Sequence, residues 1–152
     1  MEVQRDFRDF LALLNANKVK FMIVGGYALA YHGVPRFTGD IDIYVNPARE
    51  NAKRILNALA DFGFGSLDLS LDDFQDQDRV IQLGLPPVRI DILTSISGVT
   101  WKEADASKEA GYFGDVPVMY IGKKQFIANK RAIGRMKDLA DIEALGGDPS
   151  VE

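Results

Sequence analysis

The sequence contains no cysteine, a single histidine and a single tryptophan among its 152 residues. The absence of cysteine excludes a disulfide framework, a thiol nucleophile and any cysteine-based zinc or iron–sulfur centre. No apolar run approaches the roughly 20 residues that a helix needs to span a bilayer, and the charged N-terminal stretch does not resemble a signal peptide. From these absences we expect a soluble, cytoplasmic protein with no membrane partner.

The charge balance is only slightly negative. Eighteen Lys and Arg residues stand against 22 Asp and Glu residues, which gives a net charge of -4. A domain that binds nucleic acid by neutralising its phosphates is usually basic, so this class is disfavoured. Two bound divalent cations would nevertheless cancel the charge, since -4 + 4 = 0. The apolar fraction of 47% is ordinary for a globular protein and predicts one domain over residues 1–152.

The hydrophobic pattern predicts a mixture of helices and strands. Helical spacing covers residues 3–14, 27–31, 47–62 and 123–145. Strand patterns cover residues 21–24, 40–45, 80–83, 88–93 and 116–121. The acidic stretch 68–78 has irregular spacing and predicts a loop or a short helix, and the polar span around Trp101 is assigned no element. This order predicts an α+β (α/β) fold, with a small mixed sheet flanked by helices.

Two carboxylates lie on one face of the predicted strand 40–45. Alternation places Asp40 and Asp42 on one side and the three aliphatic residues of the strand on the other. Two like charges at this spacing repel each other unless a cation lies between them. The pair alone is a weak indication of a metal site.

Asp91 strengthens this indication, because it lies inside the apolar strand 88–93. Burying an unpaired carboxylate costs on the order of several kcal/mol, so a salt bridge or a metal usually accompanies it. One interpretation is an ion pair with Arg89 or another base. The other places Asp91 beside Asp40 and Asp42, where three carboxylates would offer the oxygen ligands that Mg²⁺ and Mn²⁺ prefer.

The pair Gly25 and Gly26 connects the predicted strand 21–24 to the helix that follows. Backbone N–H groups at the start of a helix bind anions, and glycine lets a phosphate approach the main chain closely. The simpler interpretation is a tight turn between a strand and a helix.

These motifs together resemble a known signature. The run VGG at residues 24–26, followed by TGDID at residues 38–42, resembles the signature of the nucleotidyltransferase superfamily related to DNA polymerase beta. Asp91 fits the third carboxylate of that signature. The longer run VGGYALAYHGVPRFTGDID is more similar to AbiEii-type and related minimal nucleotidyltransferases, several of which act in toxin–antitoxin or phage-defence systems. The resemblance covers residues 20–145, but Gly26 replaces a common serine and no large helical domain follows.

The resemblance implies a nucleotidyltransferase fold and a metal-dependent reaction. A nucleoside monophosphate would pass from an NTP such as ATP to an acceptor hydroxyl, with release of pyrophosphate. Asp40, Asp42 and Asp91 would be the catalytic residues and the ligands of two Mg²⁺ or Mn²⁺ ions. The implied nucleotide-binding and phosphate-binding residues are Gly25, Gly26, Arg36, Thr38, Lys130 and Lys137. The acceptor, whether an RNA 3′ end, a protein or a small molecule, stays open, as does a cognate antitoxin. The alternative is an inactive nucleotide-binding or interaction module.

The C-terminal segment offers a second group of polar residues. Lys130, Gly134, Lys137 and Asp141 follow spacings of 4, 3 and 4, so they share one stripe if the helix is continuous. The lysines would then meet a triphosphate. A solvated face with a Lys137–Asp141 pair is the alternative, and Gly134 is a place where the helix can split.

The remaining candidates are His32 and a few aromatic residues. A hydrolytic triad is disfavoured, since the chain has no G-x-S-x-G motif. Trp101, Tyr112 and Tyr120 offer rings that stack a base, although aromatic residues more often belong to the core.

Overall fold

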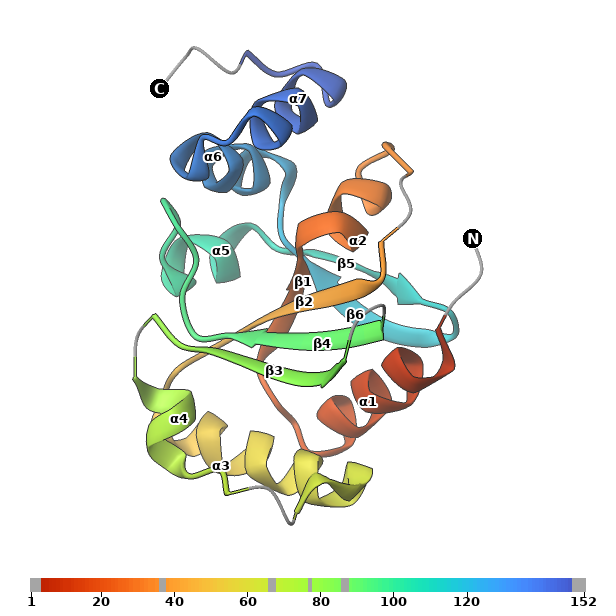
Figure 1. The fold of residues 1–152 in the computed structure, drawn as a ribbon, viewed down its shortest axis with the longest axis vertical. Helices are drawn as coiled ribbons and strands as arrows, with labels where there is room; N and C mark the ends of the chain where they lie inside the picture. Colours follow the sequence, from red (N-terminus) through yellow and green to blue (C-terminus); the bar gives the residue numbers. More distant parts are fainter. Residues whose placement is uncertain (1–3, 36–37, 66–67, 77, 86–87, 149–152) are drawn as a thin grey trace.

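Six strands form one mixed sheet at the centre of the molecule (Figure 1). The structure, a computed structural model, describes residues 4–35, 38–65, 68–76, 78–85 and 88–148. The strands are β1 (Phe21–Val24), β2 (Asp40–Val45), β3 (Val80–Leu85), β4 (Val88–Leu93), β5 (Glu109–Phe113) and β6 (Val116–Tyr120). Their order across the sheet is β3-β4-β2-β1-β6-β5. β1 runs parallel to β6 and β2 parallel to β4, and the other neighbours are antiparallel.

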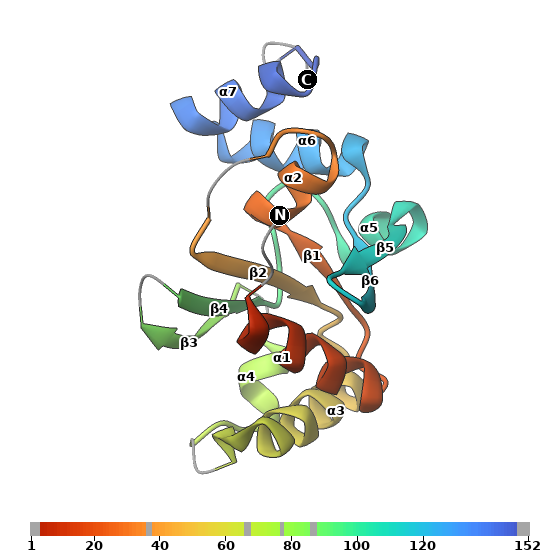
Figure 2. The same ribbon diagram turned by 90° about the vertical axis from the view of Figure 1, so that its right-hand side faces the viewer.

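Two groups of helices enclose the sheet. The helices are α1 (Arg5–Ala16), α2 (Gly25–Tyr31), α3 (Arg49–Leu59), α4 (Leu71–Gln75), α5 (Trp101–Ser107), α6 (Lys123–Ile133) and α7 (Met136–Ala144), and a π-helical turn (Ala60–Phe64) extends α3. In both views α1, α3 and α4 lie on one side of the strands, and α2, α6 and α7 lie on the other (Figures 1 and 2). The predicted α+β class, with a small mixed sheet flanked by helices, is confirmed.

The sheet forms because its central strands are apolar on the faces that the helices cover. All four residues of β1 are buried, which agrees with its unbroken apolar run. On β2 the side chains of Ile41 and Ile43 are completely buried, whereas Asp40 and Asp42 keep partial exposure. The alternation predicted from the sequence therefore orients β2 correctly.

Two elements of the structure were not predicted, namely α5 and β5. The helix α5 begins with a capping box in which Thr100 accepts a hydrogen bond from the backbone of Glu103. That T-x-x-E spacing is the sequence signal that identifies the helix. β5 is mostly exposed, so its residues lack the apolar alternation that reveals a strand.

The C-terminal segment is two helices and not one. Gly134 adopts a left-handed conformation with φ of 73°, and its N–H donates to the carbonyl of Lys130 at 2.9 Å. This is a typical helix C-terminus, and α7 starts in a new direction two residues later. The predicted helical character of residues 123–145 is therefore confirmed, but the segment is divided at Gly134, and the stripe that required one continuous helix is not formed.

Within the described residues, no helix combines the length and the apolar character needed to cross a bilayer.

Candidate active site

The three aspartates of the sequence motif lie together on two neighbouring strands. In the parallel pair of β2 and β4, Asp42 lies opposite Asp91 and Asp40 lies opposite Arg89. Asp91 is 6% exposed, whereas Asp40 and Asp42 are half-buried. We call Asp40, Asp42 and Asp91 the carboxylate cluster. The interpretation that places Asp91 beside the other two therefore describes their position correctly.

Arg89 joins two members of this cluster. Its Nε donates to Asp91 Oδ1 at 2.8 Å, and its Nη2 donates to Asp91 Oδ2 and to Asp40 Oδ2, both at 3.1 Å. The ion-pair interpretation of Asp91 is thus also correct, and the two interpretations describe one arrangement. The guanidinium of Arg89 therefore pairs with two of the three carboxylates.

Asp42 is the member of the cluster with a perturbed acidity. Burial, followed by the negative charge of Asp91, raises the pKa of Asp42 from 3.8 to about 6. Lys130 acts in the opposite direction, but its effect is smaller. A carboxylate in this state gains from any cation that approaches it.

The glycine turn at the start of α2 packs directly against the carboxylate cluster. Gly25 has φ of 69°, and a Cβ atom there would lie 2.2 Å from Asp42 Oδ2. A Cβ atom on Gly26 would lie 3.2 Å from the side chain of Thr38, whose hydroxyl donates to the Asp40 carbonyl at 3.0 Å. Glycine is therefore required at residue 25 for close packing, and a contact with phosphate at this turn stays a prediction.

A cavity of about 430 Å³ opens beside Asp42. Its polar lining includes Asp42, Asp78, Arg79, Ser95, Ser97, Asn129, Lys130 and Arg135. Arg79 and Asn129 were not among the candidates: Arg79 lies in no recognised motif, and Asn129, which directly precedes Lys130, carries no signal of its own. Asn129 is 7% exposed, and its side chain donates to the Ser97 carbonyl at 2.9 Å. Only the fold brings these groups to the same wall.

Lys130 lines this cavity but is already paired. Its Nζ lies 3.2 Å from Asp138 Oδ1 and 3.4 Å from Asp141 Oδ2, and the residue is 9% exposed. Burial alone would raise the pKa of Asp138, but hydrogen bonds from Arg135 and Lys130 outweigh it and lower that pKa. We call Lys130, Arg135, Asp138 and Asp141 the helix-pair cluster.

Lys137 does not join Lys130 at the cavity. It lies on the exposed surface of α7 and is not among the lining residues. The physical reason is the break at Gly134, which removes the helical register between the two lysines. The expected Lys137 contact with a triphosphate therefore has no support from the geometry.

Other candidate residues take structural places or lie elsewhere. Arg36 falls outside the described residues. His32 Nε2 contacts the Ile121 carbonyl at 2.7 Å, which ties α2 to the end of β6. Tyr120 is buried and stacks on Tyr31 with ring centroids 4.2 Å apart, so it belongs to the core.

The donor set of the carboxylate cluster suits a hard divalent cation. Asp40, Asp42 and Asp91 supply carboxylate oxygens, and the raised pKa of Asp42 comes first from burial and then from the negative charge of Asp91, both of which a bound cation would offset. Among the described residues, no group of three or more Asp, Glu, His or Cys side chains has the arrangement of a ready metal site. The guanidinium of Arg89 forms ion pairs with Asp40 and Asp91 at this place.

No protein-family model matches the sequence, and a comparison with curated protein sequences finds no match. Among solved structures, the fold is similar to a crystal structure from Thermotoga maritima described as a "putative nucleotidyltransferase". The TM-score is 0.58 at 16% sequence identity, over 93% of this chain and 89% of that one. At this identity the similarity shows the fold, which is nucleotidyltransferase-like.

Proposed function

We propose that the protein is a metal-dependent nucleotidyltransferase, which transfers a nucleoside monophosphate from an NTP to an acceptor hydroxyl and releases pyrophosphate. The observation that carries this proposal is the convergence of Asp40, Asp42 and Asp91 beside the Gly25 turn, in a nucleotidyltransferase-like fold. A structural ion pair alone would need one carboxylate for Arg89, whereas three are gathered here.

In this proposal the carboxylate cluster holds Mg²⁺ or Mn²⁺, two ions per site. When bound, the cations neutralise charge on the triphosphate and on the attacking and leaving oxygens. The chain's own residues orient the reactants. Arg89 donates to both oxygens of Asp91 and so fixes the direction of that carboxylate.

The reaction itself requires one proton transfer. The acceptor oxygen forms a bond to the α-phosphorus, and the bond from that phosphorus to the bridging oxygen breaks, with its electron pair leaving on pyrophosphate. The hydroxyl proton passes to a carboxylate oxygen of Asp91, which acts as the general base. Alignment of these groups is the main contribution that the protein makes to phosphoryl transfer.

The nucleotide would occupy the cavity beside Asp42. Lys130 and Arg135 supply positive charge on its wall, and Asn129 supplies an amide. Arg135 keeps 58% of its side chain exposed, so it can reach a phosphate without losing its pair with Asp138. Gly25 lines the same cavity, and Gly26 follows it and packs against Thr38. Lys137 is left out of the proposal.

The test is transfer of label from each α-³²P-labelled NTP in the presence of Mg²⁺, with total RNA or protein as acceptor. We expect labelled product with the wild-type chain and a loss of about 10³-fold or more in Asp42→Asn. The matched control is Asp72→Asn, which removes an exposed aspartate on α4. Equal labelling by Asp42→Asn and the wild-type chain would contradict the proposal.

A non-catalytic nucleotide-binding module is the second candidate. Arg89 favours it, because this guanidinium engages two of the three carboxylates that the metals need. Equilibrium dialysis with labelled NTP separates the two functions. NTP binding without Mg²⁺, together with no labelled product from any acceptor, would identify the module.

A further inference from the structure

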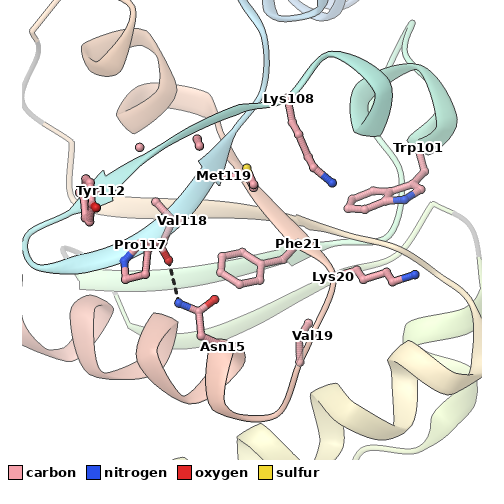
Figure 3. A pocket seen from close by; sticks show the side chains of 12 residues that line it. Asn15, Val19, Lys20, Phe21, Trp101, Lys108, Tyr112, Pro117, Val118 and Met119 are labelled. Atoms are coloured by element: carbon pink, nitrogen blue, oxygen red, sulfur yellow. Dashed lines mark hydrogen bonds between the residues drawn. The ribbon is translucent and has the colours of Figure 1, made fainter.

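A second cavity, of about 500 Å³, lies at the end of β1 that is remote from the carboxylate cluster (Figure 3). Phe21 borders this cavity and pairs with Val45, whereas Asp42 pairs with Val24 at the other end of the strand. Three residues of β-strand separate these ends by about 10 Å. The proposed transferase site does not use this cavity.

The floor of the cavity is the outer face of β6 and β5. Val116, Val118 and Tyr120 of β6 are buried, and alternation turns Pro117 and Met119 to the other face. Pro117, Val118 and Met119 all line the cavity. Tyr112 of β5 lies at one end of the cavity and is 68% exposed (Figure 3). An apolar surface that alternation turns outward is unusual unless something covers it.

The walls of the cavity are held in place by the fold. Trp101 packs edge-on against Tyr44, with ring centroids 5.1 Å apart and an interplanar angle of 77°. On the opposite wall, the Asn15 side chain donates to the Pro117 carbonyl at 2.7 Å. These contacts orient both walls before any ligand arrives, which lowers the entropic cost of binding.

The charges around the cavity are positive, although the protein as a whole is negative. Lys20 and Lys108 both line it, and none of its described lining residues is acidic. In Figure 3 both lysines lie on the same side of the cavity as Trp101. Lys108 pairs with Asp105, while no salt bridge in the described part of the chain engages Lys20. The backbone of Lys20 is fixed by two hydrogen bonds to Asn51.

We propose that this cavity binds a small planar aromatic molecule that carries an anionic group. Its ring would lie against Trp101, Met119 and Phe21, and its anionic group would lie between Lys20 and Lys108. The volume is within the range of small-molecule sites, and an apolar lining with a few converging charges is their usual composition. Cationic side chains without acidic neighbours in the lining select an anion over a neutral ring.

The sole tryptophan of the chain makes a site-specific test possible, because Trp101 lines the cavity. The probe is 8-anilino-1-naphthalenesulfonate, an aromatic anion that accepts excitation energy from a nearby tryptophan. It is displaced by naphthalene-2-carboxylate or by naphthalene-2-carboxamide, which have the same ring and differ in charge. We expect quenching of Trp101 by the probe, and displacement by the carboxylate at about tenfold lower concentration than by the carboxamide.

Variants test whether Lys20 and Lys108 cause the preference for the carboxylate over the carboxamide. Lys20→Gln combined with Lys108→Gln should remove the tenfold difference, while Lys20→Arg combined with Lys108→Arg should keep it. The charge-matched control is Lys53→Gln combined with Lys124→Gln, two exposed lysines on α3 and α6. An unchanged near-ultraviolet circular dichroism spectrum establishes that each variant is folded.

Three results would overturn the proposal. The first is equal displacement by the two naphthalene compounds, and the second is probe binding without quenching of Trp101. The third is shielding of Trp101 from iodide that increases with protein concentration, which would identify the cavity as a contact between two copies. Nucleotidyl transfer by the Lys20 and Lys108 variants should equal that of the wild-type chain, so failure of this site is distinguishable from failure of the proposed activity.

Discussion

Two clusters of charged side chains meet at the cavity beside Asp42, one on β2 and β4 and the other on α6 and α7. In the carboxylate cluster Arg89 pairs with two of the three acids, and the pKa of the third, Asp42, is raised to about 6. In the helix-pair cluster two acids meet two bases, and the pKa of Asp138 is lowered. Both clusters combine aspartates with basic side chains, but the carboxylate cluster has three acids and one base, whereas the helix-pair cluster has two of each.

This difference indicates that the charges of the helix-pair cluster stabilise the fold, whereas those of the carboxylate cluster are available to a ligand. Asp138 is completely buried, yet its hydrogen bonds from Lys130 and Arg135 more than compensate for its burial. The carboxylate cluster remains short of positive charge, which a bound cation would supply. Lys130 connects the two, because it pairs with Asp138 and also lowers the pKa of Asp42.

The largest effect on stability is expected from Lys130→Met, which breaks the balanced cluster. Removal of the ammonium leaves Asp138 and Asp141 buried with less positive charge, and loss of one partner of a buried pair costs about 3 kcal/mol or more. Urea unfolding at pH 7.5 should show that loss. Lys124→Met, an exposed substitution on the same helix, is the control and should change the free energy of unfolding by less than about 0.5 kcal/mol. Similar values for the two variants would contradict the assigned role of Lys130.

Asp42→Asn should act in the opposite direction and stabilise the metal-free protein. The folded pKa of Asp42 lies above its unfolded value, so its contribution to stability is fully present below about pH 4 and is lost as the pH rises through 6. The asparagine side chain of the variant does not ionise, so the variant does not lose stability in this pH range. In EDTA at pH 8 its free energy of unfolding should exceed that of the wild-type chain by about 2 kcal/mol, and the difference should shrink towards zero at pH 4.

The measurement is a pair of urea titrations at each pH, with Asp72→Asn as the charge-matched control. A variant that is less stable than the wild-type chain at pH 8 would show that Asp42 is not destabilised by its neighbours.

Arg89→Gln tests what holds the carboxylate cluster together without metal. Arg89 donates to Asp91 and Asp40, so its loss should lower stability in EDTA, by less than Lys130→Met does. If the proposed metal site is correct, the same change should tighten Mn²⁺ binding by several-fold, because the guanidinium no longer competes for the carboxylates. Electron paramagnetic resonance of free Mn²⁺ measures this affinity. Weaker Mn²⁺ binding in Arg89→Gln would mean that the orientation of Asp91 by Arg89 contributes more to metal binding than its competition with the ion removes.

The shared face of Asp40 and Asp42 could be predicted from the sequence because alternation along a strand is local. Asp40 and Asp42 share a face for that reason, and an acid in an apolar strand implies a partner. That Arg89 serves Asp40 as well as Asp91 could not be predicted, since this contact joins residues 49 positions apart. It depends on the register of β2 and β4, which neither strand specifies alone.

The helix-pair cluster shows the opposite case. Helical spacing predicted a stripe that joins Lys130 to Lys137 and Asp141, and the left-handed residue Gly134 interrupts that spacing. The tertiary contact of Lys130 with Asp138 instead depends on how α7 folds back on α6. Hydrophobic periodicity does not show where a helix turns back, so the sequence left one continuous helix and two helices as alternatives. The structure has two helices.

The smallest effect is expected from Lys137→Gln. This variant tests by function whether the C-terminal segment acts as one continuous helix or as two. If the helix were continuous, Lys137 would share the stripe of Lys130 and its loss would weaken NTP binding. The chain turns at Gly134, between α6 and α7, and Lys137 lies on the exposed surface. We therefore expect Lys137→Gln to change the free energy of unfolding by less than about 0.5 kcal/mol and the KM for NTP by less than about threefold. Arg135→Gln, two positions earlier and on the wall of the cavity, should raise that KM more than Lys137→Gln does. The reverse order would restore Lys137 to the phosphate site and would require α7 to reorient when the nucleotide binds.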